Sequence, residues 1–267
     1  GKEGFLKSAY SAYRERSLGL GAMGFHSYLQ SRSLPFEGIY ATGFNHKAFK
    51  YIKTQATRAS ERLADERGEA PDVSGSGRRN ANLLAVAPNA SSSIICGGTS
   101  PSIEPYRANV YTHKTLSGSF QVKNKYLEEL LQDKGLKKDE LTAVWKDIAG
   151  NEGSVQHLDI LTDEEKELFK TANEIDQIWI IEHASKRQEF ICQAQSVNLF
   201  FTIPTATEPQ EVHDEYMQYV NDVHWYGMNK LKSLYYFRTN AARNAENVNT
   251  KVQRIKLDDA ECIACEG

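Results

Sequence analysis

The sequence predicts an α/β fold, in which buried strands alternate with long helices. Short apolar runs bounded by turn residues, typical of strands, occur at residues 82–87, 197–201 and 233–237. Longer segments with helical periodicity separate these runs. Strands and helices in this order are typical of a layered or barrel architecture, so we expect a sheet that is buried on both faces.

The composition is that of an ordinary globular protein. The 267 residues are 40% hydrophobic and 25% charged, which suffices for a sizeable core. The net charge of −3 gives no electrostatic footprint for nucleic acid, and no apolar run approaches the roughly 20 residues of a membrane span. Four cysteines are too few for a secreted disulfide scaffold, so we expect a cytoplasmic protein, in the host cytoplasm if it comes from a phage. Because the chain opens on Gly1 rather than Met, we expect a piece of a longer protein or one half of a split one.

The first third of the chain is predicted to be mainly helical. Apolar residues at helical spacing predict two helices, at residues 5–32 and 46–67. Segments rich in Gly, Pro or Ser predict a loop after each of them, at residues 35–43 and 69–79. The first helix contains three glycines that permit close packing of a neighbouring backbone, Gly19, Gly21 and Gly24.

The rest of the chain combines a hairpin-like excursion with amphipathic helices. Two short strands are expected at residues 108–111 and 119–122, followed by two short helices at residues 125–133 and 138–148. Thr162 and Glu165 form a capping box, which opens a helix that we expect to continue to about residue 187. A further helix starts at Thr207, with Pro209 in its first turn, and Gly227 is its expected end.

Small polar residues follow the strand predicted at 82–87. They run from Pro88 and Asn89 through Ala90 to Ser91, Ser92 and Ser93. Such residues cap helices, and the first N–H groups of a helix have no partner within it and attract anions. The pattern is neither a Walker loop nor a dinucleotide-binding fingerprint. It leaves two interpretations open, a phosphate cradle and an ordinary Ser-rich connection.

The last 29 residues, 239–267, differ in character from the rest. Apolar periodicity stops there, and the chain ends with a Cys-x-x-Cys motif at Cys262 and Cys265. Half of a zinc site and an incidental pair remain alternatives, but we favour a mobile dithiol that carries reducing equivalents. A flexible linker of roughly 22 residues reaches about 25 Å, enough to enter a nearby cleft. Cys96 and Cys192 lie in apolar surroundings and are expected to be inert core thiols.

These features together resemble the C-terminal part of the large (α) subunit of class I ribonucleotide reductase. The residues that carry the resemblance are the segments 88–93, 103–105, 195–199 and 231–236 and the terminal Cys-x-x-Cys, in this order. The resemblance covers essentially the whole chain. It implies that residues 1–238 form the C-terminal half of a ten-stranded α/β barrel and that residues 239–267 form a flexible redox tail.

The resemblance also implies residue roles. Pro88, Asn89, Ala90, Ser91 and Ser92 would hold the diphosphate of a ribonucleoside diphosphate, mostly through backbone N–H groups. Tyr235 and Tyr236 would be a stacked pair that relays an oxidising equivalent from the partner subunit, although a Tyr-Tyr dipeptide taken alone indicates strand packing. Cys262 and Cys265 would reduce the active-site disulfide that each turnover leaves.

Partners and cofactors follow from the same resemblance. The chain would bind no metal or cofactor itself, since the metal and the radical would belong to a β subunit. Thioredoxin or glutaredoxin would supply electrons, and the α subunit would form a homodimer. The thiyl-radical cysteine would belong to an N-terminal part, so this chain alone would be inactive. Two alternatives stay open: a cobalamin-dependent reductase, against which the Tyr-Tyr pair argues, and a non-catalytic α/β scaffold that binds phosphorylated ligands.

Overall fold

The computed structural model describes residues 3–115 and 118–239 of the chain. Its N-terminal half contains α1 (Glu3–Glu15), α2 (Phe25–Ser31), α3 (Ile39–Arg67), a 3₁₀ turn (Pro71–Val73) and α4 (Ala90–Ile95). A hairpin of β1 (Val110–Thr115) and β2 (Gly118–Lys123) leads into α5 (Lys125–Asp133), α6 (Lys138–Gly150) and α7 (Asp163–Leu168). The remaining elements are α8 (Gln177–Gln188), β3 (Leu199–Phe201), α9 (Gln210–Lys230) and β4 (Phe237–Thr239).

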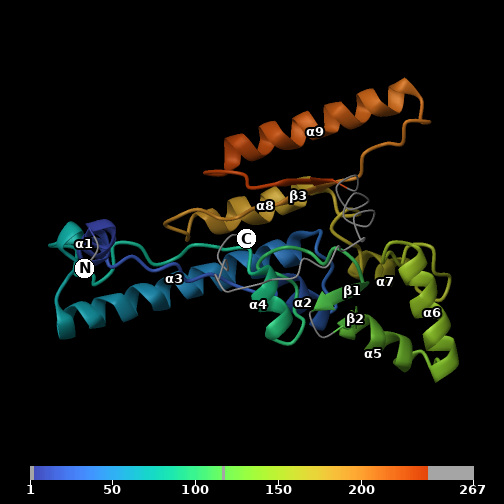
Figure 1. The fold of residues 1–267 in the computed structure, drawn as a ribbon, viewed down its shortest axis with the longest axis horizontal. Helices are drawn as coiled ribbons and strands as arrows, with labels where there is room; N and C mark the ends of the chain where they lie inside the picture. Colours follow the sequence, from blue (N-terminus) through green and yellow to red (C-terminus); the bar gives the residue numbers. More distant parts are fainter. Residues whose placement is uncertain (1–2, 116–117, 240–267) are drawn as a thin grey trace, which may run out of the picture.

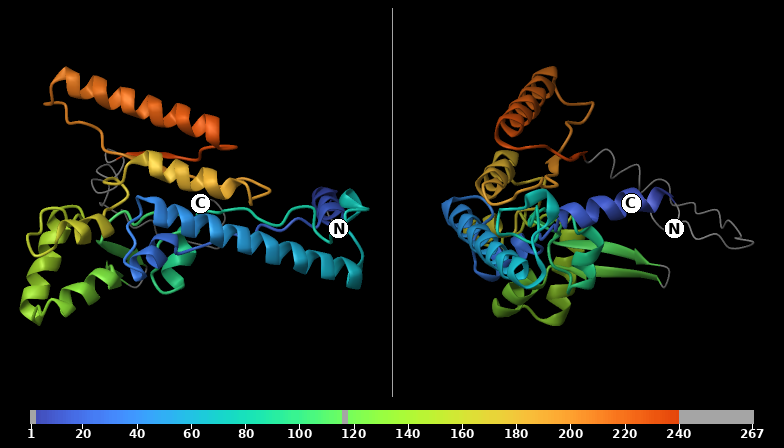
Figure 2. Two further views of the ribbon diagram at one scale, coloured as in Figure 1. Left: turned by 180° about the vertical axis from the view of Figure 1, so that it is seen from behind. Right: turned by 90° about the vertical axis from the view of Figure 1, so that its left-hand side faces the viewer.

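Four extended segments form a parallel wall, in the order in which they occur in the sequence. Leu20 bridges Leu84, and Val86 bridges Gln195, both in parallel. β3 then pairs with β4, also in parallel. Helices separate all four segments along the chain, and α8 packs between α3 and α9 (Figure 1; Figure 2, left). The predicted α/β architecture is therefore confirmed, and the strand pairings within this wall are parallel.

The segment between α1 and α2 corrects the prediction of one helix over residues 5–32. The chain leaves α1 at Arg16, whose φ is 47°, and enters α2 from Gly24, whose φ is 80°. Between them the backbone is extended, and the Leu20 N–H donates to the Leu83 carbonyl at 2.9 Å. The periodicity was misleading because strand pairing across the sheet outweighs a helix propensity that three glycines had already weakened.

Other boundaries also differ from the prediction. α3 begins at Ile39, inside the expected loop, and the helix expected over 162–187 is interrupted between α7 and α8. The Thr162–Glu165 capping box is present, with the Thr162 N–H donating to Glu165 Oε2 at 2.8 Å. Between α7 and α8, the Ala172 N–H donates to the Tyr106 carbonyl at 2.7 Å. This hydrogen bond joins residues far apart in the sequence, so local sequence patterns could not predict it.

The C-terminal elements follow the same pattern of confirmed type and shifted ends. The hairpin, α5, α6 and α9 are all present, although the hairpin strands span residues 110–115 and 118–123 and α9 begins at Gln210 rather than at Thr207. Gly227 does not end α9 but lies within it, where a Cβ would meet Leu234 at 3.0 Å. Its role is thus close packing against the chain that returns toward β4. The last strand, β4, begins at Phe237 rather than at residue 233.

Two apolar cores stabilise the fold. The larger one joins α2, α3 and α8 to the parallel wall and includes Leu29, Phe36, Leu84, Ile181 and Leu199. The smaller one lies in the lobe of α5, α6 and α7 around Trp145, at one end of the molecule (Figure 1). None of the helices that the structure describes is both long enough and apolar enough to cross a membrane.

The larger core encloses two neutral histidines, which predicts a stability that depends on pH. Burial lowers the pKa of His26 to about 3 and that of His183 to about 4, from an ordinary 6.5. His26 Nδ1 also accepts a hydrogen bond from the Tyr106 N–H at 3.0 Å, which a protonated ring cannot do. Since the folded state binds fewer protons, its stability is complete above about pH 6.5 and falls toward pH 4.

We expect the free energy of unfolding to fall by ~1.4 kcal/mol per pH unit for each histidine across this window. Urea denaturation at pH 7.5, 6 and 5 measures it. His26→Asn, whose side-chain oxygen can replace Nδ1 as the acceptor, should be destabilised at pH 7.5 but should show a shallower slope. An identical slope in the variant and the wild type would show that His26 does not titrate in this range.

Candidate functional site

The small polar stretch forms a tight turn into a short helix. Asn89 precedes α4 with a φ of 54°, a left-handed conformation that Asn tolerates better than most residues. The first bond of the helix runs from the Ser93 N–H to the Asn89 carbonyl at 3.0 Å. The N–H groups of Ala90, Ser91 and Ser92 precede this bond and have no partner within the helix. The predicted passage from an extended segment into a helical turn is therefore present.

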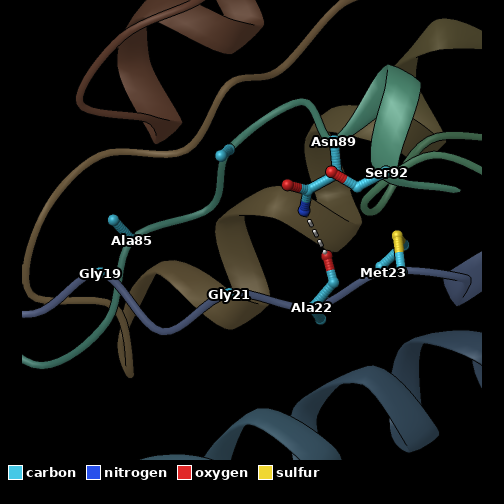
Figure 3. Close-up of a pocket in the computed structure, with 8 residues that line it drawn as sticks. Gly19, Gly21, Ala22, Met23, Ala85, Asn89 and Ser92 are labelled. Carbon is cyan, nitrogen blue, oxygen red and sulfur yellow. Dashed lines mark hydrogen bonds between the residues drawn. The ribbon is translucent and has the colours of Figure 1, made fainter. Parts of the chain in front are cut away.

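A cavity of about 190 Å³ opens beside this turn, lined by Gly19, Gly21, Ala22, Met23, Ala85, Ala87, Asn89 and Ser92. Figure 3 shows Asn89 and Ser92 on one side and the segment 19–23 on the other, with Asn89 Nδ2 donating to the Ala22 carbonyl at 3.5 Å. The cavity is smaller than pockets for whole ligands, roughly 300–1,000 Å³, and suits one end of a ligand. Pro88, Ala90 and Ser91 are not among the lining residues.

Gly21, which lines this cavity, packs closely against Ala85. A Cβ at Gly21 would lie 2.7 Å from the Ala85 carbonyl oxygen, a backbone atom that can move only with its strand segment. We expect Gly21→Ala to lower the free energy of unfolding by about 1–3 kcal/mol, as overpacking does. Gly43→Ala is the matched control, because a Cβ there meets nothing within 4 Å inside α3. Urea denaturation should show the control neutral or stabilised by about 0.5–1 kcal/mol. Equal effects of the two changes would contradict the close approach.

Tyr235 and Tyr236 lie side by side just before β4. Their ring centroids are 4.1 Å apart and their planes are inclined by 48°, so the rings are in contact but not parallel as the expected stacking implied. Both side chains are about half exposed, at 47% and 52%. Tyr236 raises the pKa of Tyr235, chiefly through a hydrogen bond between the two side chains. The two phenols therefore interact directly with each other, and both are accessible to solvent.

Backbone bonds hold the tyrosines against the segment that leads into β3. The Tyr235 N–H donates to the Val197 carbonyl at 2.9 Å, and the Leu199 N–H donates to the Tyr236 carbonyl at 2.9 Å. The Tyr236 N–H donates to Asn198 Oδ1 at 3.2 Å. The position of the pair is thus set by the parallel wall and not by a free loop.

Behind the tyrosines lies a buried polar pair that the sequence did not single out. Glu104 and Asn198 are 4% and 1% exposed, and Asn198 Nδ2 donates to Glu104 Oε1. Burial raises the pKa of Glu104, while the bond from Asn198 and the charges of Arg107 and Arg238 oppose the rise. The Arg238 guanidinium also lies 5.2 Å from the centre of the Tyr236 ring. Glu104 and Asn198 lie in two of the segments that carry the family resemblance, 103–105 and 195–199. This was the sequence signal that could have identified them as functional residues.

Of the four cysteines, the structure describes Cys96 and Cys192. Cys262 and Cys265 lie outside the described residues. Cys96, expected in the core, is exposed at the end of α4. Cys192 is half-buried, and its Sγ accepts hydrogen bonds from the N–H groups of Leu83 and Leu84 at 3.0 and 3.1 Å. Within the described residues, no group of three or more His, Cys, Asp or Glu side chains could hold a metal ion.

Comparison with known proteins identifies the family. A model of the ribonucleotide reductase barrel domain matches residues 5–76 and 70–237. The chain belongs to the ribonucleotide reductase barrel family. The resemblance predicted from the sequence motifs is thereby confirmed, and so is the barrel class of the fold.

Relatives and a solved structure agree with this assignment. The chain is 42% identical over 265 residues to the ribonucleoside-diphosphate reductase large subunit of Invertebrate iridescent virus 3, covering 98% of the chain and 40% of the relative. It is 43% identical to the putative large subunit of Frog virus 3, covering 98% and 44%. The class Id ribonucleotide reductase alpha subunit of Actinobacillus ureae aligns with a TM-score of 0.71 at 41% identity, covering 86% and 40%. The chain thus spans about two fifths of the length of these ribonucleotide reductase subunits.

Proposed function

We propose that the chain is the C-terminal portion of a ribonucleoside-diphosphate reductase α subunit, which reduces ribonucleotides to deoxyribonucleotides by a radical mechanism. The observation that carries the proposal is the contacting Tyr235–Tyr236 pair, which backbone bonds hold against the β3 segment in a chain of this family. Non-catalytic scaffolds that bind phosphate do not need such a pair. Buried or half-exposed phenols in contact suit stepwise transfer of an oxidising equivalent, because a phenol can lose an electron and a proton.

The substrate diphosphate is assigned to the turn before α4. Ala90, Ser91 and Ser92 are exposed residues whose N–H groups have no partner within α4, and Asn89 and Ser92 line the cavity beside them. Donors at a helix start favour an anion through their partial positive charge. Together with Pro88, these residues hold the diphosphate end of the substrate. The nucleoside would then extend toward groups that the rest of the α subunit supplies.

The terminal dithiol, Cys262 and Cys265, restores the active site after each turnover. Reduction of one ribose consumes two electrons and leaves a disulfide between two active-site cysteines. A thiolate of the tail attacks this disulfide, and the exchange moves the disulfide to the tail while the active-site thiols are regenerated. Thioredoxin or glutaredoxin then reduces the tail. The metal and the radical belong to the β subunit, and the remaining catalytic residues belong to the N-terminal part of an α subunit that works as a homodimer.

The decisive experiment is a reconstitution. Reduction of cytidine diphosphate is measured with this chain, the N-terminal part of the α subunit and the β subunit together, and with each of them alone. We expect activity in the full mixture and none in any single component. An assembled mixture that shows no activity but still binds the diphosphate would favour the non-catalytic scaffold instead.

A further inference from the structure

Glu104 is a buried carboxylate to which the proposed function assigns no role. It is 4% exposed, and burying a carboxylate is costly unless it is paired and hydrogen-bonded. Burial raises the pKa of Glu104, and the hydrogen bond from Asn198 and the charges of Arg107 and Arg238 limit that rise. The contacts of this buried carboxyl group lead through Asn198 to Tyr236.

These contacts determine the orientation of the Asn198 amide. The Tyr236 N–H can only donate a hydrogen bond, and Glu104 in its ionised form can only accept one. Asn198 bridges them, with Nδ2 donating to Glu104 Oε1 and Oδ1 accepting from the Tyr236 N–H at 3.2 Å. An amide between an obligatory acceptor and an obligatory donor has one satisfied orientation. Glu104 therefore decides which end of Asn198 faces Tyr236.

Glu104 also interacts electrostatically with Arg238, which in turn contacts the Tyr236 ring. Arg238 follows Tyr236 by two residues, and its guanidinium lies 5.2 Å from the centre of the Tyr236 ring. The same guanidinium charge lowers the pKa of Glu104. Glu104 thus interacts with two groups that contact Tyr236, Asn198 at its backbone and Arg238 at its ring, although it lies 132 positions earlier in the chain.

We propose that Glu104 is a positioning residue for the radical relay: through Asn198 it fixes the backbone at Tyr236, and thereby the contact between the Tyr236 and Tyr235 rings. The functional consequence rests on the proposed relay, whereas the geometric claim does not. Transfer between phenols depends steeply on their separation, and a displacement of about 1 Å at a reacting group can cost on the order of 100-fold in rate.

The kinetic test uses the reconstituted enzyme with Glu104→Ala, Glu104→Gln and a control, Glu37→Ala. Glu37 is a partly buried carboxylate that accepts from a backbone N–H, that of Asp176 at 2.7 Å, and it pairs with Lys170. We expect Glu104→Ala to lower kcat by about 10- to 100-fold with little change in KM, because the diphosphate turn is untouched. Glu37→Ala should change kcat by less than about twofold, because the contacts of Glu37 with Asp176 and Lys170 do not involve either tyrosine of the pair.

Glu104→Gln separates positioning from folding. It keeps an oxygen that can accept from Asn198, so it should fold and recover part of the lost kcat. Its own N–H₂ group can also face Asn198, so the amide no longer has one satisfied orientation, and recovery should be incomplete. Equal kcat in all three variants, or equal losses in Glu104→Ala and Glu37→Ala, would overturn the proposal.

A second readout needs no turnover. 3-Fluorotyrosine is placed at position 236 alone, and fluorine-19 NMR is recorded on the assembled protein. We expect one narrow resonance in the wild type and in Glu37→Ala, and a displaced or broadened one in Glu104→Ala. An unchanged resonance in Glu104→Ala would refute the positioning role. If the wild-type mixture reduces no substrate, the proposed function fails, and the resonance still decides the geometric claim.

Discussion

Replacing either Tyr235 or Tyr236 with phenylalanine is expected to abolish ribonucleotide reduction in the reconstituted enzyme. Phenylalanine keeps the ring and its contact across 4.1 Å but lacks the hydroxyl that is oxidised and deprotonated. Substrate binding should survive, since neither tyrosine lines the cavity beside the diphosphate turn. The measurement is the rate of cytidine diphosphate reduction together with the substrate dissociation constant, for each variant and the wild type.

Tyr51→Phe serves as the control for the tyrosine pair. Tyr51 lies on α3 and is 66% exposed, so the change removes a hydroxyl from another exposed tyrosine that lies outside the pair. It should leave the rate unchanged. Substantial turnover in Tyr235→Phe or Tyr236→Phe would exclude an obligatory relay through these two side chains, whatever else the chain does.

Replacing Cys262 or Cys265 with serine is expected to stop repeated turnover while leaving the first turnover intact. A prereduced enzyme already holds the electrons for one reduction, but a tail with one thiol cannot complete the exchange that regenerates the active site. Product formed per active site should therefore level off near one with thioredoxin as the reductant. The wild type should continue linearly in the same assay.

A small dithiol gives the matched control for this prediction. Dithiothreitol can diffuse into the active site and reduce its disulfide directly, so it should restore repeated turnover to Cys262→Ser. Failure of dithiothreitol to restore it would indicate damage other than a lost shuttle. Repeated turnover of Cys262→Ser with thioredoxin alone would show that the tail dithiol is dispensable.

Local patterns predicted those elements whose stability is local. The amphipathic helices α5 and α6 and the capping box at Thr162 lie where spacing and capping chemistry placed them. Predictions were wrong where a distant partner outweighed propensity, as for the segment around Leu20, which pairs with Leu84 instead of continuing a helix. Cys96 shows the same limit, since apolar neighbours in sequence did not make it buried.

The motifs alone were enough to predict the family, because each motif consists of residues that are adjacent in the chain. The resemblance in turn implied the roles of the turn into α4 and of the tyrosine pair. The pairing of Glu104 with Asn198, and of Asn198 with Tyr236, joins residues 94 and 38 positions apart. A hydrogen bond requires its two atoms within about 3.5 Å, and only the path of the folded chain brings such distant residues that close. The residues proposed for the relay can thus be named from the sequence, whereas the groups that contact them from distant segments appear only in the tertiary structure.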